Sequence, residues 1–409
     1  MKVKPGYKQT EVGVLPEEWQ VKRIDQVADA NWGNTAITKD AYREAGYPAY
    51  SASGLDGFVS WFDHDKPAVI LSAIGAQCGK TWFATDKWTA IKNTIWIRGE
   101  DGEATSEFIY RVTGNPSFWP NRGQAQPFIA LGDVRAAKIP VPPLPEQRAI
   151  AAALSDMDEL LGGLDRLIAK KRDLKQAVMQ QLLTGQTRLP GFGVTRSFVS
   201  DELGTRPQDW DMVPLNELVD PSRGIRYGIV QPGAYDPNGR FMIRAQDYSE
   251  AKGWADPSDV FRVSDTIEQR YRSARVQHGD LIMTIVGYCG HVEIVPAWLD
   301  GANLTQTTAR IAIQSGRASP QFCKYMLQSA VGRSQVASFL KGAAQPGLNC
   351  GDVEKFRLPL PKMREQTAIA AGLSDMDAEL AALEARRDKT RDLKQAMMQE
   401  LLTGRTRLL

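Results

Sequence analysis

The feature that most constrains this chain is a segment of about 40 residues that occurs twice. Residues 145–185 are PEQRAIAAALSDMDELLGGLDRLIAKKRDLKQAVMQQLLTG, and residues 364–404 are REQTAIAAGLSDMDAELAALEARRDKTRDLKQAMMQELLTG. Corresponding residues are 219 positions apart throughout (Ser155 to Ser374, for example), without an insertion or deletion. Such a long, faithful repeat indicates a chain built from two copies of one plan.

Both copies have the pattern of a long amphipathic helix, because apolar residues recur every three or four positions. Gly185 and Gly404 stand where left-handed C-caps are expected. At about 1.5 Å per residue, the helix would be roughly 60 Å long and could not bury its apolar stripe alone. We expect it to pair with its copy as a coiled coil; in the alternative interpretation, each helix packs only on its own domain. The predicted helix-pairing residues are Ile150, Leu154, Met157, Leu161, Leu164, Ile369, Leu373, Met376, Leu380 and Leu383, and the stripe continues through Leu174 and Leu393.

The segments outside the helices also correspond. Residues 13–19 (GVLPEEW) are echoed by residues 204–210 (GTRPQDW). The last residues match 184–189, which continue into LPGF, and a similar continuation, KPGY, stands at the start of the chain. We therefore expect a circular, pseudo-two-fold arrangement with antiparallel helices. The predicted division is a first globular domain (1–144), a first spacer helix (145–186), a second globular domain (187–363) and a second spacer helix (364–409).

Within the globular domains, short apolar runs are separated by Gly, Pro and Asn, which is typical of β-strands. Residues 68–75 and 93–97 predict a strand–turn–strand unit in the first domain, and residues 280–287 and 308–313 predict the same unit in the second. The predicted fold class is therefore α+β, with two globular mixed α/β domains separated by a long antiparallel two-helix coiled coil.

Composition excludes some classes of protein. No run of about 18 apolar residues appears, so we expect no membrane span. The N-terminal MKVKPGYKQT lacks the apolar segment of a signal peptide, and the four cysteines form no CxxC pair, so a cytoplasmic location is expected. The net charge of +2 neither supports nor excludes nucleic acid as a ligand, because a local basic face can exist within a balanced total.

Motifs that would indicate catalysis are incomplete. Residues 75–81 (GAQCGKT) resemble a phosphate-binding loop, but Ile74 stands where the first glycine is required. Residues 115–118 (NPSF) resemble the NPPF/Y motif of amino-methyltransferases but lack the second proline, so a plain turn is favoured. The three histidines show no metal-ligand spacing. We expect a non-enzymatic chain with no cofactor, no metal and no catalytic residue.

Signals for nucleic-acid binding are stronger. Arg, Gln and Asn near turns offer hydrogen bonds to base edges, and Lys or Arg can hold phosphates. Any one such residue is more often an ordinary solvated side chain, but the duplicated layout favours base recognition. The candidate DNA-binding residues are Lys80, Thr81, Lys92, Asn93, Arg122, Gln124 and Gln126 in the first domain and Arg226, Tyr227, Arg244, Gln246, Thr284, His291, Asn303, Gln306, Lys341 and Gln345 in the second.

Over nearly its whole length, the sequence resembles the specificity subunit of Type I restriction–modification systems. The resemblance rests on PLPEQRAIA at 143–151, on the DLKQA(V/M)MQ(Q/E)LLTG segments at 173–185 and 392–404, and on the two-fold layout. It implies two target recognition domains that each bind one half of a bipartite, asymmetric site in double-stranded DNA. It also implies that the helices fix the spacer and dock two methyltransferase subunits, with restriction subunits as an optional addition. Two alternatives stay open: a self-contained DNA methyltransferase, and a coiled-coil interaction scaffold without DNA binding.

Overall fold

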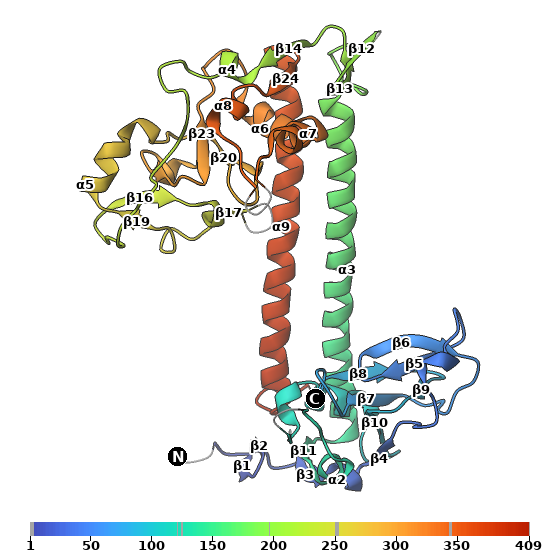
Figure 1. The fold of residues 1–409 in the computed structure, drawn as a ribbon. Helices are drawn as coiled ribbons and strands as arrows, with labels where there is room; N and C mark the ends of the chain where they lie inside the picture. Colours follow the sequence, from blue (N-terminus) through green and yellow to red (C-terminus); the bar gives the residue numbers. More distant parts are fainter. Residues whose placement is uncertain are drawn as a thin grey trace. The chain divides into compact units, whose positions relative to one another are not determined.

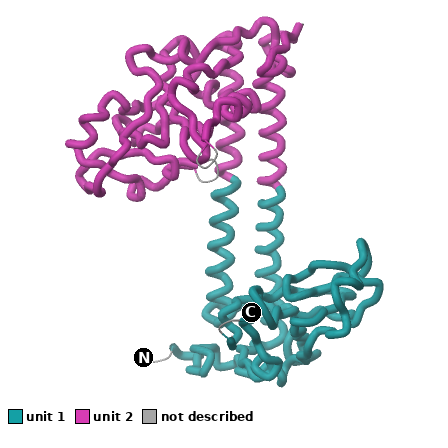
Figure 2. The backbone as a smooth tube through the Cα atoms, viewed as in Figure 1, with its two compact units in different colours: residues 1–166, 383–409 teal, residues 167–382 magenta. Residues whose placement is uncertain are grey.

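The computed structural model describes residues 4–120, 122–123, 126–195, 197–249, 253–342 and 346–408. The chain divides into two compact units (Figure 2): unit 1 comprises residues 1–166 and 383–409, and unit 2 comprises residues 167–382. Each unit therefore contains one globular block together with a part of each repeated segment.

Both repeated segments are helical, as predicted (Figure 1). Helix α3 spans Leu144–Leu183, and helix α9 spans Met363–Leu401. The predicted left-handed caps are confirmed, since Gly185 and Gly404 have φ values of +65° and +66°. After α9, the Gly404 amide donates to the Leu401 carbonyl and the Arg405 amide to the Glu400 carbonyl, which is a Schellman motif. Within the described residues, no helix has the apolar length needed to cross a membrane.

Unit 1 is built on a four-stranded antiparallel sheet in the order β4-β10-β7-β8. Its strands are β4 (Ala28–Trp32), β7 (Ala68–Ser72), β8 (Thr81–Ala84) and β10 (Thr94–Gly99). The strands predicted within 68–75 and 93–97 are confirmed as antiparallel neighbours, with Leu71 opposite Ile95. A second sheet, in the order β6-β5-β9, contains β5 (Tyr47–Ser51), β6 (Gly54–Val59) and β9 (Thr89–Ala90).

Both faces of the four-stranded sheet are covered, which explains the continuous apolar run of β7. Val69 and Leu71 belong to a core cluster that includes residues of α1 (Ser106–Thr113) and α2 (Leu131–Ala136). Ile70 points to the opposite face and packs with Tyr50 and Trp88. The remaining strands are β1 (Tyr7–Thr10), which pairs with β2 (Gly13–Pro16), and β3 (Gln20–Arg23), which pairs with β11 (Lys138–Val141).

The same sheet recurs in unit 2, in the order β15-β23-β20-β21. Its strands are β15 (Ile225–Tyr227), β20 (Leu281–Thr284), β21 (Val292–Ile294) and β23 (Thr308–Ile311). The strands predicted within 280–287 and 308–313 are again antiparallel neighbours, with Met283 opposite Ala309. The predicted strand–turn–strand unit is therefore present in both blocks.

The rest of unit 2 surrounds this sheet. On one face, Ile282 packs with Ile243 and Leu304 from the β19-β16-β22 sheet, which consists of β16 (Arg240–Ile243), β19 (Arg262–Val263) and β22 (Asn303–Leu304). On the other face, Met283 packs with Tyr325 of α6 (Pro320–Gln328).

The other helices are α4 (Leu215–Leu218), α5 (Asp265–Glu268), α7 (Ala330–Phe339) and α8 (Cys350–Val353). The other strands are β12 (Phe198–Asp201), β13 (Gly204–Pro207), β14 (Asp211–Pro214), β17 (Tyr248–Ser249), β18 (Gly253–Trp254) and β24 (Arg357–Leu360).

Ion pairs show that the helices run antiparallel within each unit. In unit 1, Lys394 Nζ lies 2.5 Å from Asp158 Oδ1, and Arg387 Nη1 lies 3.8 Å from Asp165 Oδ1. In unit 2, Lys171 Nζ lies 2.6 Å from Glu379 Oε1, and Lys175 pairs with Asp377. In both units, residue numbers rise along α3 as they fall along α9. The Lys175–Asp377 pair is the repeat of Lys394–Asp158, so the predicted antiparallel, pseudo-two-fold pairing is confirmed.

The predicted helix-pairing residues contact both the other helix and a globular block. Ile150 and Leu154 form a cluster with Leu401 of α9 and Phe108 of the block. The alternative in which each helix packs only on its own domain is therefore wrong. Ile369 and Leu373 belong to a cluster with Leu182, Leu183 and Tyr325. Leu164 and Leu380 are buried, and Met157, Leu161, Met376 and Leu383 are half-buried. The extension of the stripe to Leu174 and Leu393 is wrong, because these side chains are 49% and 55% exposed.

The predicted circular arrangement is confirmed by the contacts after each helix. In unit 1, the Tyr7 hydroxyl donates to the Gly404 carbonyl at 3.0 Å, and a Cβ added to Gly404 would lie 2.5 Å from Pro16 Cδ. In unit 2, a Cβ added to Gly185 would lie 2.3 Å from Pro207 Cγ. The start of the chain thus occupies the position after α9 that residues 204–207 occupy after α3.

Candidate nucleic-acid interface

In unit 1, backbone hydrogen bonds bring three turns together at one end of the main sheet. The turns are residues 73–80, residues 91–93 and a hairpin whose described residues are 122–123 and 126–128. The Ala73 amide donates to the Asn93 carbonyl at 3.0 Å, the Gly75 amide to the Pro127 carbonyl at 3.0 Å, and the Ile129 amide to the Ala73 carbonyl at 2.8 Å. We call this arrangement the three-turn cluster.

Unit 2 has the same cluster, formed by residues 285–291, residues 305–307 and a hairpin whose described residues are 341–342 and 346–347. The Ile285 amide donates to the Thr307 carbonyl, the Gly287 amide to the Pro346 carbonyl and the Leu348 amide to the Ile285 carbonyl, each at 2.8–2.9 Å. The glycines of the first turn have positive φ in both units, for example +101° at Gly75 and +79° at Gly287. Left-handed geometry at these positions favours glycine, which explains the glycines that the sequence repeats.

Most of the candidate DNA-binding residues fall on or directly beside these clusters. In unit 1 these are Lys80, Thr81, Lys92, Asn93, Arg122 and Gln126, and in unit 2 they are Thr284, His291, Gln306 and Lys341. Gln124 and Gln345 lie outside the described residues. Residues far apart in sequence are thus gathered into one surface in each unit.

One cation in each hairpin is held by a carboxylate, and the two pairs are repeats of each other. Arg122 pairs with Asp133 in unit 1, and Lys341 Nζ lies 2.8 Å from Asp352 Oδ2 in unit 2. The hydrogen bond from Lys341 lowers the pKa of the Asp352 carboxyl below its ordinary value. The side chains of Arg122 and Lys341 remain 59% and 65% exposed, so each can also contact an external anion. Lys80, Lys92, Gln126 and Gln306 are exposed as well.

Three candidates in unit 2 are buried, and their side chains are used inside the protein. The Thr284 hydroxyl donates to the Tyr288 carbonyl at 2.6 Å and accepts from the His291 amide at 3.0 Å. The His291 ring is stacked on Tyr248, with 5.3 Å between centroids. The Asn303 amide donates to Glu268 Oε1 at 3.0 Å. The prediction that Thr284, His291 and Asn303 contact DNA is therefore not retained, because the fold would have to open before these side chains reached a base.

The other candidate side chains differ in their exposure and in their contacts within the protein. Asn93 has φ +68°, a conformation that asparagine tolerates in turns, so its residue type has a local explanation. Thr81 is half-buried at the start of β8. Arg244 donates to Asp247 Oδ1 at 2.7 Å and to the Asp259 carbonyl at 3.0 Å, so its guanidinium is engaged within unit 2. Gln246 is exposed beside it, and Arg226 and Tyr227 are exposed on β15.

The sequence reasoning missed exposed aromatic rings beside the clusters. Tyr288, at the tip of the first turn of unit 2, is 79% exposed. Tyr227 was predicted, but its counterpart in unit 1, Trp32, was not; these rings are 50% and 38% exposed. Each precedes a glycine that lies against the second turn, since a Cβ on Gly33 or Gly228 would lie within 2.3 Å of a backbone oxygen. The aromatic–glycine pair at both positions is the signal that could have identified them.

This combination suits a nucleic-acid ligand. Exposed cations can neutralise phosphates, amide side chains can donate to and accept from base edges, and exposed rings can stack on bases. Because the turns are joined by backbone hydrogen bonds, they present these groups from a fixed scaffold.

Comparison with known proteins gives consistent results. The family model described as "Type I restriction modification DNA specificity domain" matches residues 16–169 and 207–390. The chain is 26% identical over 414 residues to the Type I restriction enzyme MjaVIII specificity subunit of Methanocaldococcus jannaschii, covering 96% of this chain and 94% of the relative. It is 28% identical over 252 residues to the EcoBI specificity subunit of Escherichia coli, covering 60% of this chain and 52% of the relative.

Solved structures share the fold. The S subunit of a Type I restriction-modification system from M. genitalium aligns with a TM-score of 0.62 and 14% identity, over 98% of each chain. A chain from a structural study of complex assembly and conformational transition of the type I R-M system aligns with a TM-score of 0.54 and 18% identity, over 95% of this chain and 99% of that one.

Proposed function

Because the chain belongs to the family of Type I restriction modification DNA specificity domains, we propose that it is the DNA-recognition subunit of a restriction–modification complex. Each unit binds one half of a bipartite, asymmetric site in double-stranded DNA. The functional division follows the predicted one, with target recognition domains at 1–144 and 187–363 and spacer helices at 145–186 and 364–409.

The observation that carries this proposal is the duplicated three-turn cluster with different side chains. The same backbone hydrogen bonds occur in both units, yet Lys92 in unit 1 corresponds to Gln306 in unit 2. Likewise, Trp32 corresponds to Tyr227. A shared scaffold with different donors and rings is what recognition of two different half-sites requires, because base edges are distinguished by their hydrogen-bonding pattern.

The helices supply the spacing in this proposal. Both α3 and α9 continue from one unit into the other, since the unit boundaries fall at residues 166/167 and 382/383. A continuous helix is a stiff connection with a fixed rise per residue. The number of helical residues between the domains is therefore the quantity that we expect to set the spacer of the DNA site.

In this proposal the methyl group is transferred by partner methyltransferase subunits, and the chain itself is not catalytic. A self-contained methyltransferase would bind S-adenosylmethionine as the isolated chain, which equilibrium dialysis can measure. A scaffold without DNA binding would leave the partner subunits with the same sequence preference in the presence and absence of the chain.

The test removes one side chain from each cluster, at equivalent positions, by replacing it with alanine. The chain is produced with its methyltransferase subunits in a host that lacks DNA methylation, and methylated bases are mapped across the genome. Gln306→Ala is expected to relax selectivity at one or two base pairs of one half-site, by about 1–3 kcal/mol per pair. Lys92→Ala, at the matching position of unit 1, is expected to affect only the other half-site.

Each variant is the control for the other, since both remove an exposed side chain from the same turn of the same fold. Changes at the same base pairs in both variants would contradict the assignment of one unit to each half-site. Methylation at unrelated sequences, or methylation independent of the chain, would contradict the recognition function itself.

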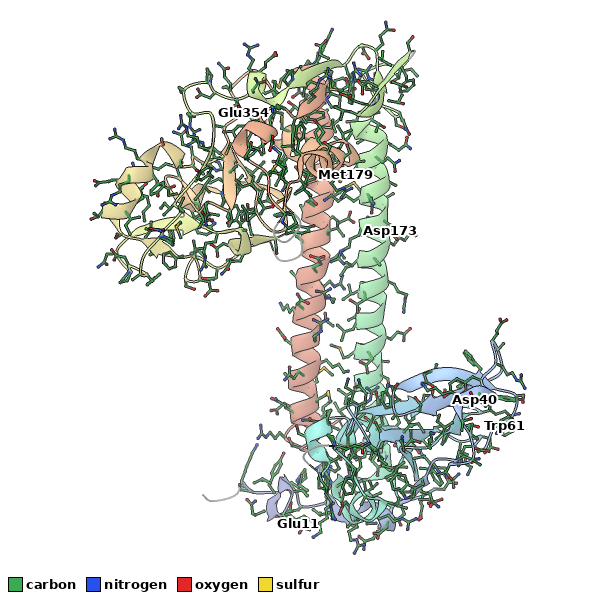
Figure 3. The ribbon with its side chains drawn as sticks, viewed as in Figure 1. Glu11, Asp40, Trp61, Asp173, Met179 and Glu354 are labelled. Carbon is green, nitrogen blue, oxygen red and sulfur yellow. The ribbon has the colours of Figure 1, made fainter. Side chains whose placement is uncertain are left out.

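A repeated exposed patch supports the docking of two methyltransferase subunits. Leu174 in unit 2 and Leu393 in unit 1 are exposed repeats of each other, and so are Ala177 and Ala396, which lie three positions further on and therefore on the same face of each helix. Figure 3 labels Asp173, the neighbour of Leu174, on α3. An exposed leucine in an otherwise polar helix face suits a protein contact. Because the patch occurs once in each unit, it suits two copies of the same partner.

Leu174→Asp and Leu393→Asp are each expected to remove one methyltransferase subunit from the complex, because a buried, unpaired carboxylate is costly at a protein interface. The mass of the purified complex should fall by one subunit in each single variant and by two in the double variant. Gln176→Asp and Gln395→Asp are the controls, because these exposed repeats stand two positions after each leucine and so point away from it on the helix. Two bound subunits in the double variant would exclude this patch as the docking surface.

A further inference from the structure

We propose that a cleft in unit 2 lined by arginines binds a phosphate group. The cleft has a volume of about 420 Å³ and lies beside strands β15 and β23 of the main sheet. Its arginines are Arg223, Arg226, Arg272, Arg275 and Arg310. The proposal deepens the proposed function, and it rests on that function only for DNA as the source of the phosphate.

The wall of the cleft is held by Arg310, which is only 2% exposed. Its Nη1 donates to the carbonyls of Ser273 at 2.9 Å and Arg275 at 2.6 Å. Its Nη2 donates to the carbonyls of Arg223 and Gly224. These carbonyls belong to the two segments that carry the other arginines, so Arg310 is a positioning residue. Its Nε is buried and has no hydrogen-bond partner among the described residues.

The cleft holds more cations than anions. Arg223 pairs with Asp280, with 2.5 Å between Nη2 and Oδ2, and Arg275 pairs with Glu268, with 2.6 Å between Nη2 and Oε2. In the part of the chain that the structure describes, no carboxylate forms an ion pair with Arg226, Arg272 or Arg310. Burial and the charge of neighbouring Arg223 lower the pKa of Arg310 to about 10, and the charges of Asp280 and Asp220 oppose this effect only in part.

Asp300 also lines the cleft, and it belongs to neither the Arg223–Asp280 nor the Arg275–Glu268 pair. Its Oδ1 accepts a hydrogen bond from the His278 amide at 2.8 Å, so the carboxylate braces the wall. Asp220 also attracts the Arg310 guanidinium. With Asp220, Glu268, Asp280 and Asp300 counted, four carboxylates face five guanidiniums, which leaves an excess of positive charge.

Unit 1 shows that this fold does not require arginine here. In unit 2, Arg226 of β15 stands opposite Arg310 of β23. In unit 1, Asn31 of β4 stands opposite Trp96 of β10 at the corresponding positions. Trp96 is buried in an apolar cluster. An apolar ring is favourable at a buried site, whereas a buried guanidinium loses hydration. Unit 2 therefore keeps a costly charge where the same scaffold accepts an apolar side chain, which a bound anion explains.

The position of the cleft favours a phosphate of the DNA backbone. Arg226 and Tyr227 are consecutive residues of β15, an edge strand of the main sheet, so their exposed side chains lie on opposite faces of one edge. DNA that contacts the Tyr227 ring beside the three-turn cluster would thus pass the same edge of the sheet, where Arg226 can reach a phosphate. Guanidinium groups suit this ligand, because they form bidentate, charge-assisted hydrogen bonds to phosphate oxygens. A soluble phosphate ester or inorganic phosphate offers the same chemistry.

The test uses Arg226→Ala, Arg272→Ala and the double variant of the full chain, since both side chains are exposed and their removal leaves the core intact. Arg270→Ala is the control, because Arg270 is exposed nearby but does not line the cleft. In the first arm, the Tm of the chain is measured in sodium phosphate and in sodium chloride of equal ionic strength. Phosphate stabilises folded proteins in general. If the cleft binds free phosphate, phosphate should raise the Tm of the natural chain and of the control more than that of the double variant.

In the second arm, the complex with methyltransferase subunits binds its DNA site, in which single phosphates are replaced one at a time by neutral methylphosphonates. We expect one position in one half-site at which the replacement weakens binding by the natural chain roughly tenfold or more. The same replacement should have no effect on binding by the double variant.

If one methylphosphonate weakens DNA binding by the natural chain but not by the double variant, the ligand is a DNA phosphate. If the two proteins differ only in their Tm shift in phosphate, the ligand is a soluble phosphate. Equal behaviour of the natural chain and the double variant in both arms overturns the proposal. If the natural chain binds no specific DNA, the proposed function fails, and the first arm still decides whether the cleft binds phosphate.

Discussion

Replacing Glu146 by alanine is expected to destabilise unit 1 by about 3 kcal/mol, because it breaks a buried ion pair from one side. Glu146 is fully buried at the start of α3. Its Oε1 accepts from Arg407 Nε at 2.5 Å, and its Oε2 accepts from Arg407 Nη2 at 2.8 Å and from the Trp19 indole at 2.9 Å. Without the carboxylate, the buried Trp19 indole N–H would lose its partner, and the Arg407 guanidinium would keep only the exposed Glu18.

The free energy of unfolding, measured with urea, checks this expectation. Glu365 is the repeat of Glu146 and pairs with Arg188 through Nε at 2.8 Å and Nη2 at 2.5 Å. In unit 2 the Trp210 indole N–H has no hydrogen-bond partner among the described residues. Glu365→Ala is therefore expected to cost about 1 kcal/mol less than Glu146→Ala, by the value of one hydrogen bond.

Glu18 provides a negative control for the same ion pair. Glu18 also contacts Arg407, at 3.0 Å, but its side chain is 70% exposed, so Glu18→Ala should change stability by less than about 1 kcal/mol. Equal stability of the natural chain and Glu146→Ala would show that the buried pair does not hold the end of the chain against α3.

The same residues show which parts of the fold the sequence could predict. The helices, their caps and their antiparallel pairing were predictable because a repeated apolar period and a terminal glycine are local signals. The Glu146-Gln147 pair belongs to the repeat, but its burial could not be predicted from it. Gln147 accepts from the Thr105 amide at 2.9 Å and donates to the Pro142 carbonyl at 2.9 Å, so it joins helix and block. Such burial depends on partners as distant in sequence as Thr105 for Gln147 and Arg407 for Glu146, which periodicity does not reveal.

The candidate site was predictable only as far as the repeat marked its turns. Lys92, Arg122, Gln306 and Lys341 could be proposed because they are cations and amides near turns of a duplicated layout. The burial of Thr284 could not be predicted, because all four residues of β20 are buried and the strand lacks the usual alternation of inward and outward side chains. The arginine cleft was missed because β15 and β23 bring Arg226 and Arg310 together, although they are far apart in sequence.

Lengthening both spacer helices by seven residues is expected to move the chain to a new DNA site. The insertions are placed between Arg166 and Leu167 in α3 and between Ala382 and Leu383 in α9, at the boundary of the two units. Seven residues make two turns of a coiled coil, so each helix would keep the face that it presents to its partner. The added length is about 10 Å, or roughly three base pairs at about 3.4 Å each.

The methylated site of this variant should keep both half-site sequences, with a spacer longer by about two to three base pairs. Affinity for the original site should fall at least roughly a thousandfold, towards non-specific binding, because only one half-site can be bound at a time. The control places the same seven residues after Asp256, in an exposed loop of unit 2, and should keep the original spacer. If the lengthened helices still select the original spacer while both half-sites are recognised, then the helices do not determine the separation, and a flexible connection must accommodate the DNA instead.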